Sequence, residues 1–507
     1  MESLAPLAIA GPLLIAAALA GSVALSRRES DLAGVVAGVA VAALCAVLLV
    51  DAWGSDGPLT TFLGGWEPRQ GVALGIALAF DPFGAALALL AAVLVTAAFA
   101  FAWRYFDAAG PLFHALMLVF LGGMVGFCLS GDLFDLFVFF ELMSVSAFAL
   151  TAYRTESTGP LQGALTFAVT NSIGAMLLLF GIGLLYGRTG ALNLAQVGQA
   201  LAGQPADGLV VCAFGLIVVG FMVKAAIVPF HFWLADAYAV APTPACIVFS
   251  GVMSDLGIYA IARVYWTVFD GTLDEHVAAL RMVLVGAGAL TAVWGAAMCI
   301  AQHRLKRLLA FVTISQVGMA LMAVGLLTAP GLAATALLIG VDGLLRAGLF
   351  VIVGAIGHRC GSMHEHRLRG RGREMSWTVK VAFVVGVLGL AGLPPVGAFV
   401  GKGALERAAA ELGYGWVTPI ILVSTVLTCG ALLRAGGRVF LGWGRPEAAE
   451  PEVEGEETIG GRDHTPWPMT ASAVALVVAG VALGAIPGLA AAAAGVAGSF
   501  TDRHAYA

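Results

Sequence analysis

Residues 221–245 read FMVKAAIVPFHFWLADAYAVAPTPA, and this stretch is the most informative about the architecture. An apolar run that carries Lys224 is interrupted by Pro229 and followed by Pro242 and Pro244. Proline inside a membrane helix breaks the hydrogen-bond ladder, and the freed backbone groups are tolerated only where protein or a watery cavity covers them. We therefore predict a broken membrane helix with a lysine beside the break.

A second stretch repeats this pattern in the other half of the chain. Residues 390–402, LAGLPPVGAFVGK, place Pro394 and Pro395 shortly before Lys402. Two interrupted helices at corresponding positions of two halves are typical of an inverted-repeat transporter. Proline kinks are common in membrane helices, so the prolines alone are a weak signal, and the two lysines strengthen it. The alternative for Lys402 is a position near the membrane surface, from which a lysine reaches the headgroups.

The composition indicates a membrane protein without a redox centre of its own. The chain has 507 residues, of which 60% are hydrophobic and 11% charged, whereas a soluble domain carries about 25% charged residues. The seven cysteines form no CxxC pair, and no His/Cys cluster has metal-ligand spacing. Glycine motifs for dinucleotides or phosphates are also missing from the sequence. We expect an all-α polytopic membrane protein with no cofactor and no metal.

Apolar runs that are long enough to cross a bilayer, about 20 residues each, occur about fourteen times. They lie near residues 6–25, 32–50, 80–102, 112–129, 133–152, 161–186, 208–229, 243–268, 278–301, 308–327, 331–356, 378–400, 415–440 and 468–490. The first run lacks a preceding basic segment, so we expect a membrane helix there and not a cleaved signal peptide. Residues 71–79 are expected to be extended.

The basic residues orient these spans. Most of the 26 Lys and Arg residues fall in connections from an odd to an even span, above all in residues 358–376. The positive-inside rule makes this side cytoplasmic and places both termini, together with Arg263, on the other side. Residues 358–376 are interpreted as a topogenic loop, with binding of anionic lipid or of a partner as the alternative. Residues 446–464 are acidic and are interpreted as a disordered linker.

Six ionisable side chains occur within or at the end of apolar runs, where a charge costs about 2.5–3.5 kcal/mol on insertion scales and marks a functional site by default. They are Glu141, Lys224, Asp255, Asp342, Arg346 and Lys402. Burial disfavours the charged forms of such groups, and neighbours of opposite charge restore them. In a row of alternating charges, a proton that enters one pair can therefore shift the protonation of the next pair. We predict that these six side chains form a proton-transfer axis.

Structural roles are the alternatives. Asp342 and Arg346 are four residues apart on a predicted helix, so they can form a closed ion pair that holds helices together. Purely structural pairing is also the alternative for Glu141, Lys224 and Asp255.

Two further residues flank the predicted axis. His231 can relay protons between Lys224 and the cytoplasmic side, because the pKa of a histidine lies near neutrality; the alternative is an interfacial histidine that caps a broken helix. Lys306 can open an inner half-channel, and its alternative is a topogenic charge.

Four segments together resemble the antiporter-like membrane subunits of respiratory complex I, Mrp sodium/proton antiporters and membrane-bound hydrogenases. They are GDLFDLFVFFELMSVSAFAL, FMVKAAIVPFHFWLADAYAVAPTPA, LKRLLAFVTISQVGMA and LAGLPPVGAFVGK. The resemblance leans toward the Mrp D-type subunit. It implies about fourteen helices with two inverted five-helix repeats, a broken helix in each repeat, and a central hydrophilic axis that conducts protons. By position, Glu141 and Lys224 resemble the family's glutamate–lysine pair, and Lys402 resembles the lysine of the second broken helix.

The chain departs from this family pattern in its second half. Asp255 stands where the family usually has a lysine, and Gln316 where a histidine is often found. Asp342 and Arg346 replace a histidine and a lysine. Arginine cannot release its proton, so Arg346 cannot relay as a lysine would. The second half-channel of this chain is therefore expected to differ from that of its relatives.

These observations predict a proton-conducting, antiporter-like subunit of a larger complex in the cell membrane, with protons and sodium as the candidate ions. The alternatives are a proton-pumping membrane subunit of a complex I-like or hydrogenase-like enzyme, and a scaffold that has lost conduction. The expected regions are 1–110 with three helices, 111–268 and 278–440 as two repeats, 441–467 as an acidic cytoplasmic linker, and 468–507 as a last helix and tail.

Overall fold

A computed structural model of the chain describes residues 4–22, 26–55, 57–66, 68, 73, 75–103, 105–106, 110–394, 397–445 and 464–502. Residues 446–463 of the predicted acidic linker 441–467 therefore lie outside the described residues, and so does Pro395.

Helices make up nearly all of the structure. The α-helices are α1 Leu4–Gly21, α2 Arg27–Trp53, α3 Pro82–Ala102, α4 Pro111–Leu129, α5 Leu133–Thr151, α6 Thr158–Thr189, α7 Leu194–Leu201, α8 Gly208–Lys224, α9 Phe232–Val240, α10 Thr243–Val248, α11 Ser254–Val264, α12 Val277–Ala301, α13 Leu305–Gly325, α14 Ala329–Cys360, α15 Trp377–Ala391, α16 Phe399–Glu411, α17 Val417–Gly436, α18 Trp467–Ala485 and α19 Leu489–Thr501. Short π-helical turns at Phe249–Met253, Tyr265–Phe269 and Gly437–Leu441 extend α10, α11 and α17. Strands β1 Leu59–Phe62 and β2 Ala77–Phe80 form an antiparallel hairpin.

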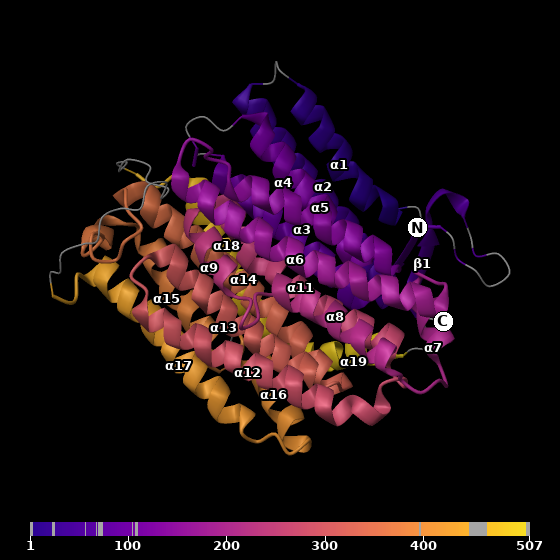
Figure 1. The fold of residues 1–507 in the computed structure, drawn as a ribbon. Coiled ribbons are helices and arrows are strands. Elements are labelled where there is room, and N and C mark those ends of the chain that lie inside the picture. The colour runs from indigo at the N-terminus through magenta and orange to yellow at the C-terminus, as the bar shows by residue number, and fades with distance from the viewer. Residues whose placement is uncertain are drawn as a thin grey trace.

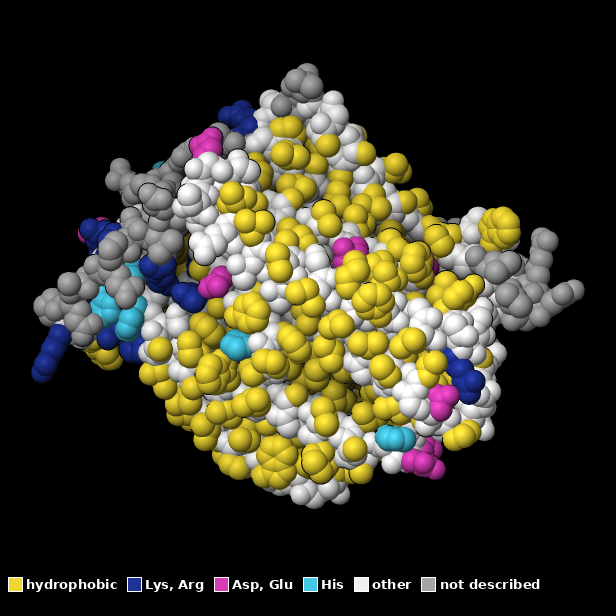
Figure 2. All heavy atoms as spheres, in the orientation of Figure 1, with side chains coloured by type: hydrophobic (Ala, Val, Ile, Leu, Met, Phe, Trp, Pro, Cys, Tyr) yellow, Lys and Arg dark blue, Asp and Glu magenta, His cyan; other side chains and the backbone are white. Residues whose placement is uncertain are grey.

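Within the described part of the chain, twelve helices are long and apolar enough to cross a membrane. The two broken helices, α8 with α9 and α15 with α16, complete the fourteen crossings that the sequence predicts. Hydrophobic side chains cover most of the face that Figure 2 shows, and the charged side chains on that face lie mainly toward two opposite sides of the bundle. The prediction of an all-α polytopic membrane protein is confirmed.

The first break comes earlier than the sequence predicts. The expected span 208–229 ends at Lys224, because the backbone leaves the helix at Ala226, which has a φ of 54°. The freed backbone groups find partners, as a break inside a membrane requires. Trp233 Nε1 donates to the carbonyl of Val223 at 3.0 Å, and the amide of Val228 donates to Thr291 Oγ1 of α12 at 3.1 Å.

Glycines form the second break. The helix α15 ends at Ala391, not at residue 400, with Gly392 in the left-handed conformation as its cap. Gly397 has a φ of +67°, and a Cβ at this position would lie 2.4 Å from the carbonyl oxygen of Gly389. Only glycine fits this close approach without strain, and the chain then enters α16.

Several connections gather at one end of the bundle (Figure 1), where arginines hold them together. We call this the basic end, formed by residues 300–307, 358–376 and 434–445. Arg434 donates to the carbonyl of Ile300 at 2.6 Å, and Arg373 donates to the carbonyl of Leu441 at 2.6 Å. Arginines of the predicted topogenic loop thus also cap helix ends.

The opposite end, which we call the terminal end, carries the hairpin, α7 and both ends of the chain (Figure 1). Part of the run 71–79 is extended as predicted, since β2 begins at Ala77. One expectation was wrong here, because residues after 488 form a further helix, α19, where only a tail was predicted. Arg263, which the sequence analysis placed on the same side as both termini, is fully buried in α11.

Candidate proton-transfer axis

Lys224 is fully buried at the last residue of α8. Its ammonium donates to Ser144 Oγ of α5 at 2.9 Å and lies 5.0 Å from the ring centre of Phe140 and 5.8 Å from that of Phe167. A hydroxyl and two aromatic faces stabilise a cation less than a carboxylate ion pair does. The ammonium is therefore held where both loss and uptake of a proton are possible.

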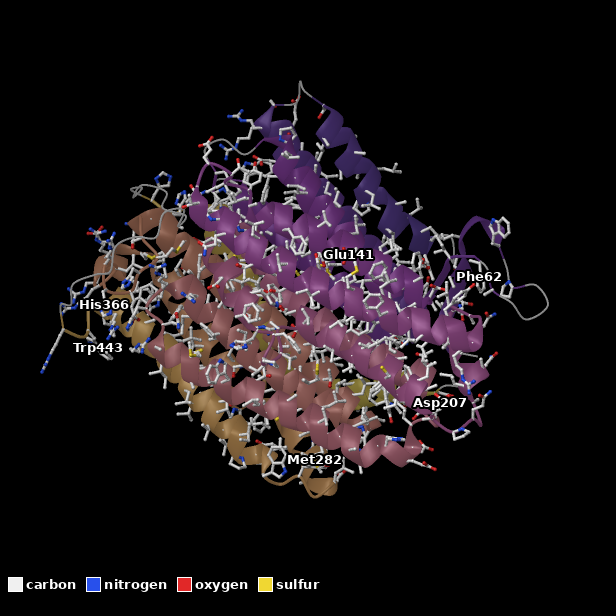
Figure 3. All side chains as sticks on the ribbon, in the orientation of Figure 1. Phe62, Glu141, Asp207, Met282, His366 and Trp443 are labelled. Carbon is white, nitrogen blue, oxygen red and sulfur yellow. The ribbon has the colours of Figure 1, made fainter. Side chains whose placement is uncertain are left out.

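Glu141 lies one helical turn before Ser144 on α5, and its side chain is half-buried. Figure 3 places it near the middle of the bundle's length. The Glu141 and Lys224 charges act on each other electrostatically. Among the described residues, however, no ion pair within 4.0 Å joins the two side chains. The predicted pair is thus close in space but not in contact.

Arg346 of α14 forms an ion pair with Asp255 of α11, and both side chains are almost fully buried. The alternative prediction that Arg346 closes onto Asp342 was therefore wrong. Tertiary packing brings Asp255, which is distant in sequence, next to Arg346. This ion pair forms instead of the local pair with Asp342, which lies four residues before Arg346 on the same helix.

Asp342 is the least satisfied carboxylate of the axis. It is buried, and within the described residues neither of its oxygens has a hydrogen-bond partner. The charges of Arg346 and Lys402 act on it. Since buried polar groups are normally hydrogen-bonded, the ionised form of Asp342 has little stabilisation other than the charges of Arg346 and Lys402.

Lys402 is buried in α16, so the interpretation that it reaches the membrane surface was wrong. Its ammonium donates to the carbonyl of Leu390 at 2.7 Å and to Thr425 Oγ1 of α17 at 2.9 Å. The Leu390 carbonyl belongs to the C-terminal turn of α15, where the helix dipole favours a cation.

Further polar side chains lie on the helices between the two lysines, and of these only Gln316 was singled out from the sequence. Tyr238 and Ser254 share a hydrogen bond of 3.0 Å, and Ser250 and Thr313 share one of 2.7 Å. Gln316 is buried on α13, and neither side-chain atom has a partner in the part of the chain that the structure describes. In the sequence, these residues could have been recognised as isolated hydroxyl and amide side chains inside apolar runs.

The two flanking candidates have different surroundings from those predicted. Half-buried His231 stands at the N-cap position of α9 but makes no side-chain capping hydrogen bond there. Its ring instead accepts a hydrogen bond from Trp294 Nε1 of α12 at 2.8 Å, so both the relay and the capping role stay predictions. Lys306 is buried and donates to the carbonyl of Ala241, just after α9. Lys306 thus joins the end of the first broken helix to the basic end.

A histidine–glutamate cluster at the basic end was also missed. His303, Glu365 and His366 have ligand atoms within 4.8 Å of one another, a separation from which a cation can be held. Glu365 is fully buried, but it already forms an ion pair with Arg438 and lies 3.6 Å from Arg434. Two guanidinium groups repel a divalent cation, so we assign the cluster to holding the loops together.

Comparison with known proteins gives consistent matches over most of the chain. A protein-family model described as NADH:quinone oxidoreductase/Mrp antiporter, TM, matches residues 130–428. The N subunit of the NADH-quinone oxidoreductase of Desulforudis audaxviator is 31% identical over 434 residues, which are 85% of this chain and 85% of the relative. The D subunit of the Na(+)/H(+) antiporter of Bacillus subtilis is 27% identical over 402 residues, which are 78% of each chain.

Comparison with a solved structure shows that the similarity covers the whole fold. A chain in the structure of the Mrp complex from Dietzia sp. DQ12-45-1b superposes with a TM-score of 0.88 at 27% identity. The match covers 100% of this chain and 98% of that chain.

Proposed function

Because the chain belongs to the NADH:quinone oxidoreductase/Mrp antiporter transmembrane family, we propose that it conducts protons as an antiporter-like subunit of a multi-subunit membrane complex. The observation that carries the proposal is Lys224, a fully buried ammonium that has a hydroxyl at 2.9 Å and the charge of Glu141 nearby. Such a group can gain and lose a proton within the membrane.

We assign the switching step to Glu141 and Lys224. A proton that binds Glu141 removes the negative charge that favours the ammonium, so Lys224 then releases its own proton more readily. Ionisation of Glu141 reverses the effect. The two groups therefore exchange protons as a coupled pair.

The second half of the axis works with different groups. Arg346 keeps its proton, so its role is to hold Asp255 ionised and to set the field at Asp342. Asp342 and Lys402 interact electrostatically and are the exchangeable pair of this half. The sodium ion remains a candidate for the counter-transported cation, as the name of the Bacillus subtilis relative suggests.

The proposal places neighbouring subunits against the face of α5 that carries Glu141. A carboxylate that is half-buried near the middle of the bundle's length is not compatible with a lipid contact, which would cost about 2.5–3.5 kcal/mol. A polar or basic group of an adjoining membrane protein would satisfy Glu141.

We propose that the basic end faces the cytoplasm and the terminal end faces outward. The positive-inside rule supports this orientation, because the loops with most of the arginines gather at the basic end. Both termini are then extracytoplasmic. The proposed regions are 1–110, the repeats 111–268 and 278–440, the linker 441–467, and the C-terminal region 468–507.

The test removes each member of the switching pair. Lys224→Ala and Glu141→Ala, each in the complete complex in everted vesicles, should abolish transport while the chain stays inserted. Lys380→Ala and Glu411→Ala, on exposed or half-exposed positions of α15 and α16, are the matched controls and should transport normally. Wild-type rates in either Lys224→Ala or Glu141→Ala would remove the pair from the mechanism.

A second candidate is a proton-pumping subunit of a redox enzyme, which the 31% identical relative from an NADH-quinone oxidoreductase favours. Mass spectrometry of the gently solubilised complex separates the two. Iron–sulfur or nickel subunits among the partners would favour the redox enzyme, and small multi-helix subunits would favour the antiporter.

A third candidate is a non-conducting scaffold, which the closed ion pair between Asp255 and Arg346 favours. In the purified complex, Asp255→Asn combined with Arg346→Met, which leaves no buried charge unpaired, should lower ion flux if the axis conducts. An unchanged flux would support the scaffold.

A further inference from the structure

A row of buried polar side chains runs along α11, from Asp255 of the proposed axis toward the terminal end. Asp255, Tyr259 and Arg263 are spaced four residues apart and therefore share one face of the helix. Eight residues of α-helix span about 12 Å, while half of a bilayer's hydrocarbon core is about 15 Å thick. The row thus extends about 12 Å from the ion pair with Arg346 toward the terminal end.

The outer end of this row is a buried ion pair. Arg263 NH2 donates to Asp81 Oδ2 at 2.6 Å, and the two side chains are 0% and 2% exposed. Tyr259 accepts a hydrogen bond from Arg263 at 3.0 Å and donates to the carbonyl of Cys128 at 2.9 Å. Gly84 permits this arrangement, because a Cβ there would lie 2.9 Å from the Tyr259 hydroxyl.

Asp81 also lines a cavity of about 290 Å³ at the terminal end, in which Ser55, Asp81 and Ser499 are the polar side chains among mainly apolar lining residues. The cavity is lined by Ser55 and Gly57 after α2, and by Ser499 of α19. Helix α19 covers the inner side of the cluster, since the ring of Phe500 lies 4.0 Å from the Arg263 guanidinium carbon. A carboxylate is therefore placed between a buried row of polar groups and a cavity.

We propose that Asp81 is an outward proton-exchange site, gated by Arg263 and covered by α19. The proposal rests on the proposed proton conduction and names a route by which the axis reaches the extracytoplasmic side. A proton that arrives along the α11 face binds the Asp81 carboxylate and breaks its ion pair with Arg263. Release of that proton into the cavity restores the carboxylate and the ion pair. Arg263 stays protonated throughout.

The competing explanation is an ion pair that only holds α3 against α11. Removal of one partner leaves the other charged and buried, which destabilises any protein, so single variants do not separate the two explanations. The double variant Asp81→Asn with Arg263→Gln leaves no charge unpaired. A purely structural pair tolerates this change, whereas an exchange site does not.

The experiment measures proton flux of the complete complex in everted vesicles. The double variant should assemble normally and lose at least tenfold in flux. Arg188→Gln with Asp207→Asn removes an exposed ion pair of 3.6 Å between the end of α6 and the start of α8. This control should leave the flux unchanged. Wild-type flux in the Asp81/Arg263 double variant, with Lys224→Ala inactive, would overturn the outward site and leave the proposed function standing. Active Lys224→Ala would instead overturn the proposed function.

A labelling measurement keeps the proposal testable if the double variant does not assemble. Ser499→Cys, in a background where the other cysteines are retained as a reference, should react with a membrane-impermeant maleimide added from the extracytoplasmic side. Absence of this additional labelling would overturn the proposal, because the cavity would then be closed to that side.

Discussion

The two broken helices hold their lysines in different ways. Lys224 precedes its break and donates to one hydroxyl, Ser144 Oγ, with aromatic rings on its other sides. Lys402 follows its break and has two oxygen acceptors, one of which is the Leu390 carbonyl at the C-terminal turn of α15. The helix dipole adds to the stabilisation of Lys402. A lysine at a broken helix therefore has one oxygen acceptor in the first half of the chain and two in the second.

The ion pair between Asp255 and Arg346 separates the two halves, and its disruption should have the largest effect. Arg346→Met leaves Asp255 buried and uncompensated, which costs about 3–5 kcal/mol. That is a large share of the stability of a typical domain, about 5–15 kcal/mol. We expect loss of the assembled protein, measured by size-exclusion chromatography after solubilisation. Arg346→Met combined with Asp255→Asn should recover assembly; if it does not, the loss has another cause than the unpaired charge.

Substitution of Gly397, at the break between α15 and α16, should lower thermal stability more than substitution of a nearby glycine. Gly397→Ala forces a Cβ against the backbone of Gly389 at a positive φ, so we expect lower thermal stability and a displaced Lys402. Gly403→Ala, also in this region but with open space at its Cβ, is the matched control. Equal melting temperatures of the two variants, measured by fluorescence-based thermal unfolding, would show that the break is not constrained as described.

The first lysine should depend strongly on its single hydroxyl partner. Ser144→Ala removes the acceptor of Lys224 and should lower proton flux about tenfold, equivalent to about 1.4 kcal/mol and within the range for a hydrogen bond to a charged group or its loss. Ser146→Ala is the control, because that hydroxyl donates to the carbonyls of its own helix at Leu142 and Met143. Equal fluxes in the two variants would contradict the role of Ser144.

The second lysine should be less sensitive. Thr425→Val removes one acceptor of Lys402 and leaves the Leu390 carbonyl in place. We expect a smaller loss of proton flux than in Ser144→Ala, because the Leu390 carbonyl still accepts a hydrogen bond from the Lys402 ammonium. A larger loss than that of Ser144→Ala would reverse the comparison between the two broken helices.

The sequence was sufficient to predict what depends on local patterns. Apolar run lengths predicted the crossings, and prolines beside Lys224 and Lys402 predicted the two broken helices. The family resemblance was confirmed as well. The break positions differed by several residues, because the end of each helix depends on partners such as Thr291 on another helix.

Contacts between distant segments could not be predicted in this way. Arg346 pairs with Asp255 and not with Asp342, because the packing of α11 against α14 determines which carboxylate is within reach. Arg263 and Asp81 lie 182 residues apart, so the sequence around either residue does not predict their contact. The assigned roles of the axis residues remain predictions that rest on this geometry.

The central claim is that Lys224 releases and regains a proton, and is not merely a fixed positive charge. Lys224→Arg tests it most directly, because arginine preserves the charge but does not release its proton. Proton flux through the complete complex in everted vesicles should fall to the level of Lys224→Ala, with the chain inserted and assembled. Flux near the wild-type level in Lys224→Arg would show that a fixed charge is enough and would contradict the claim.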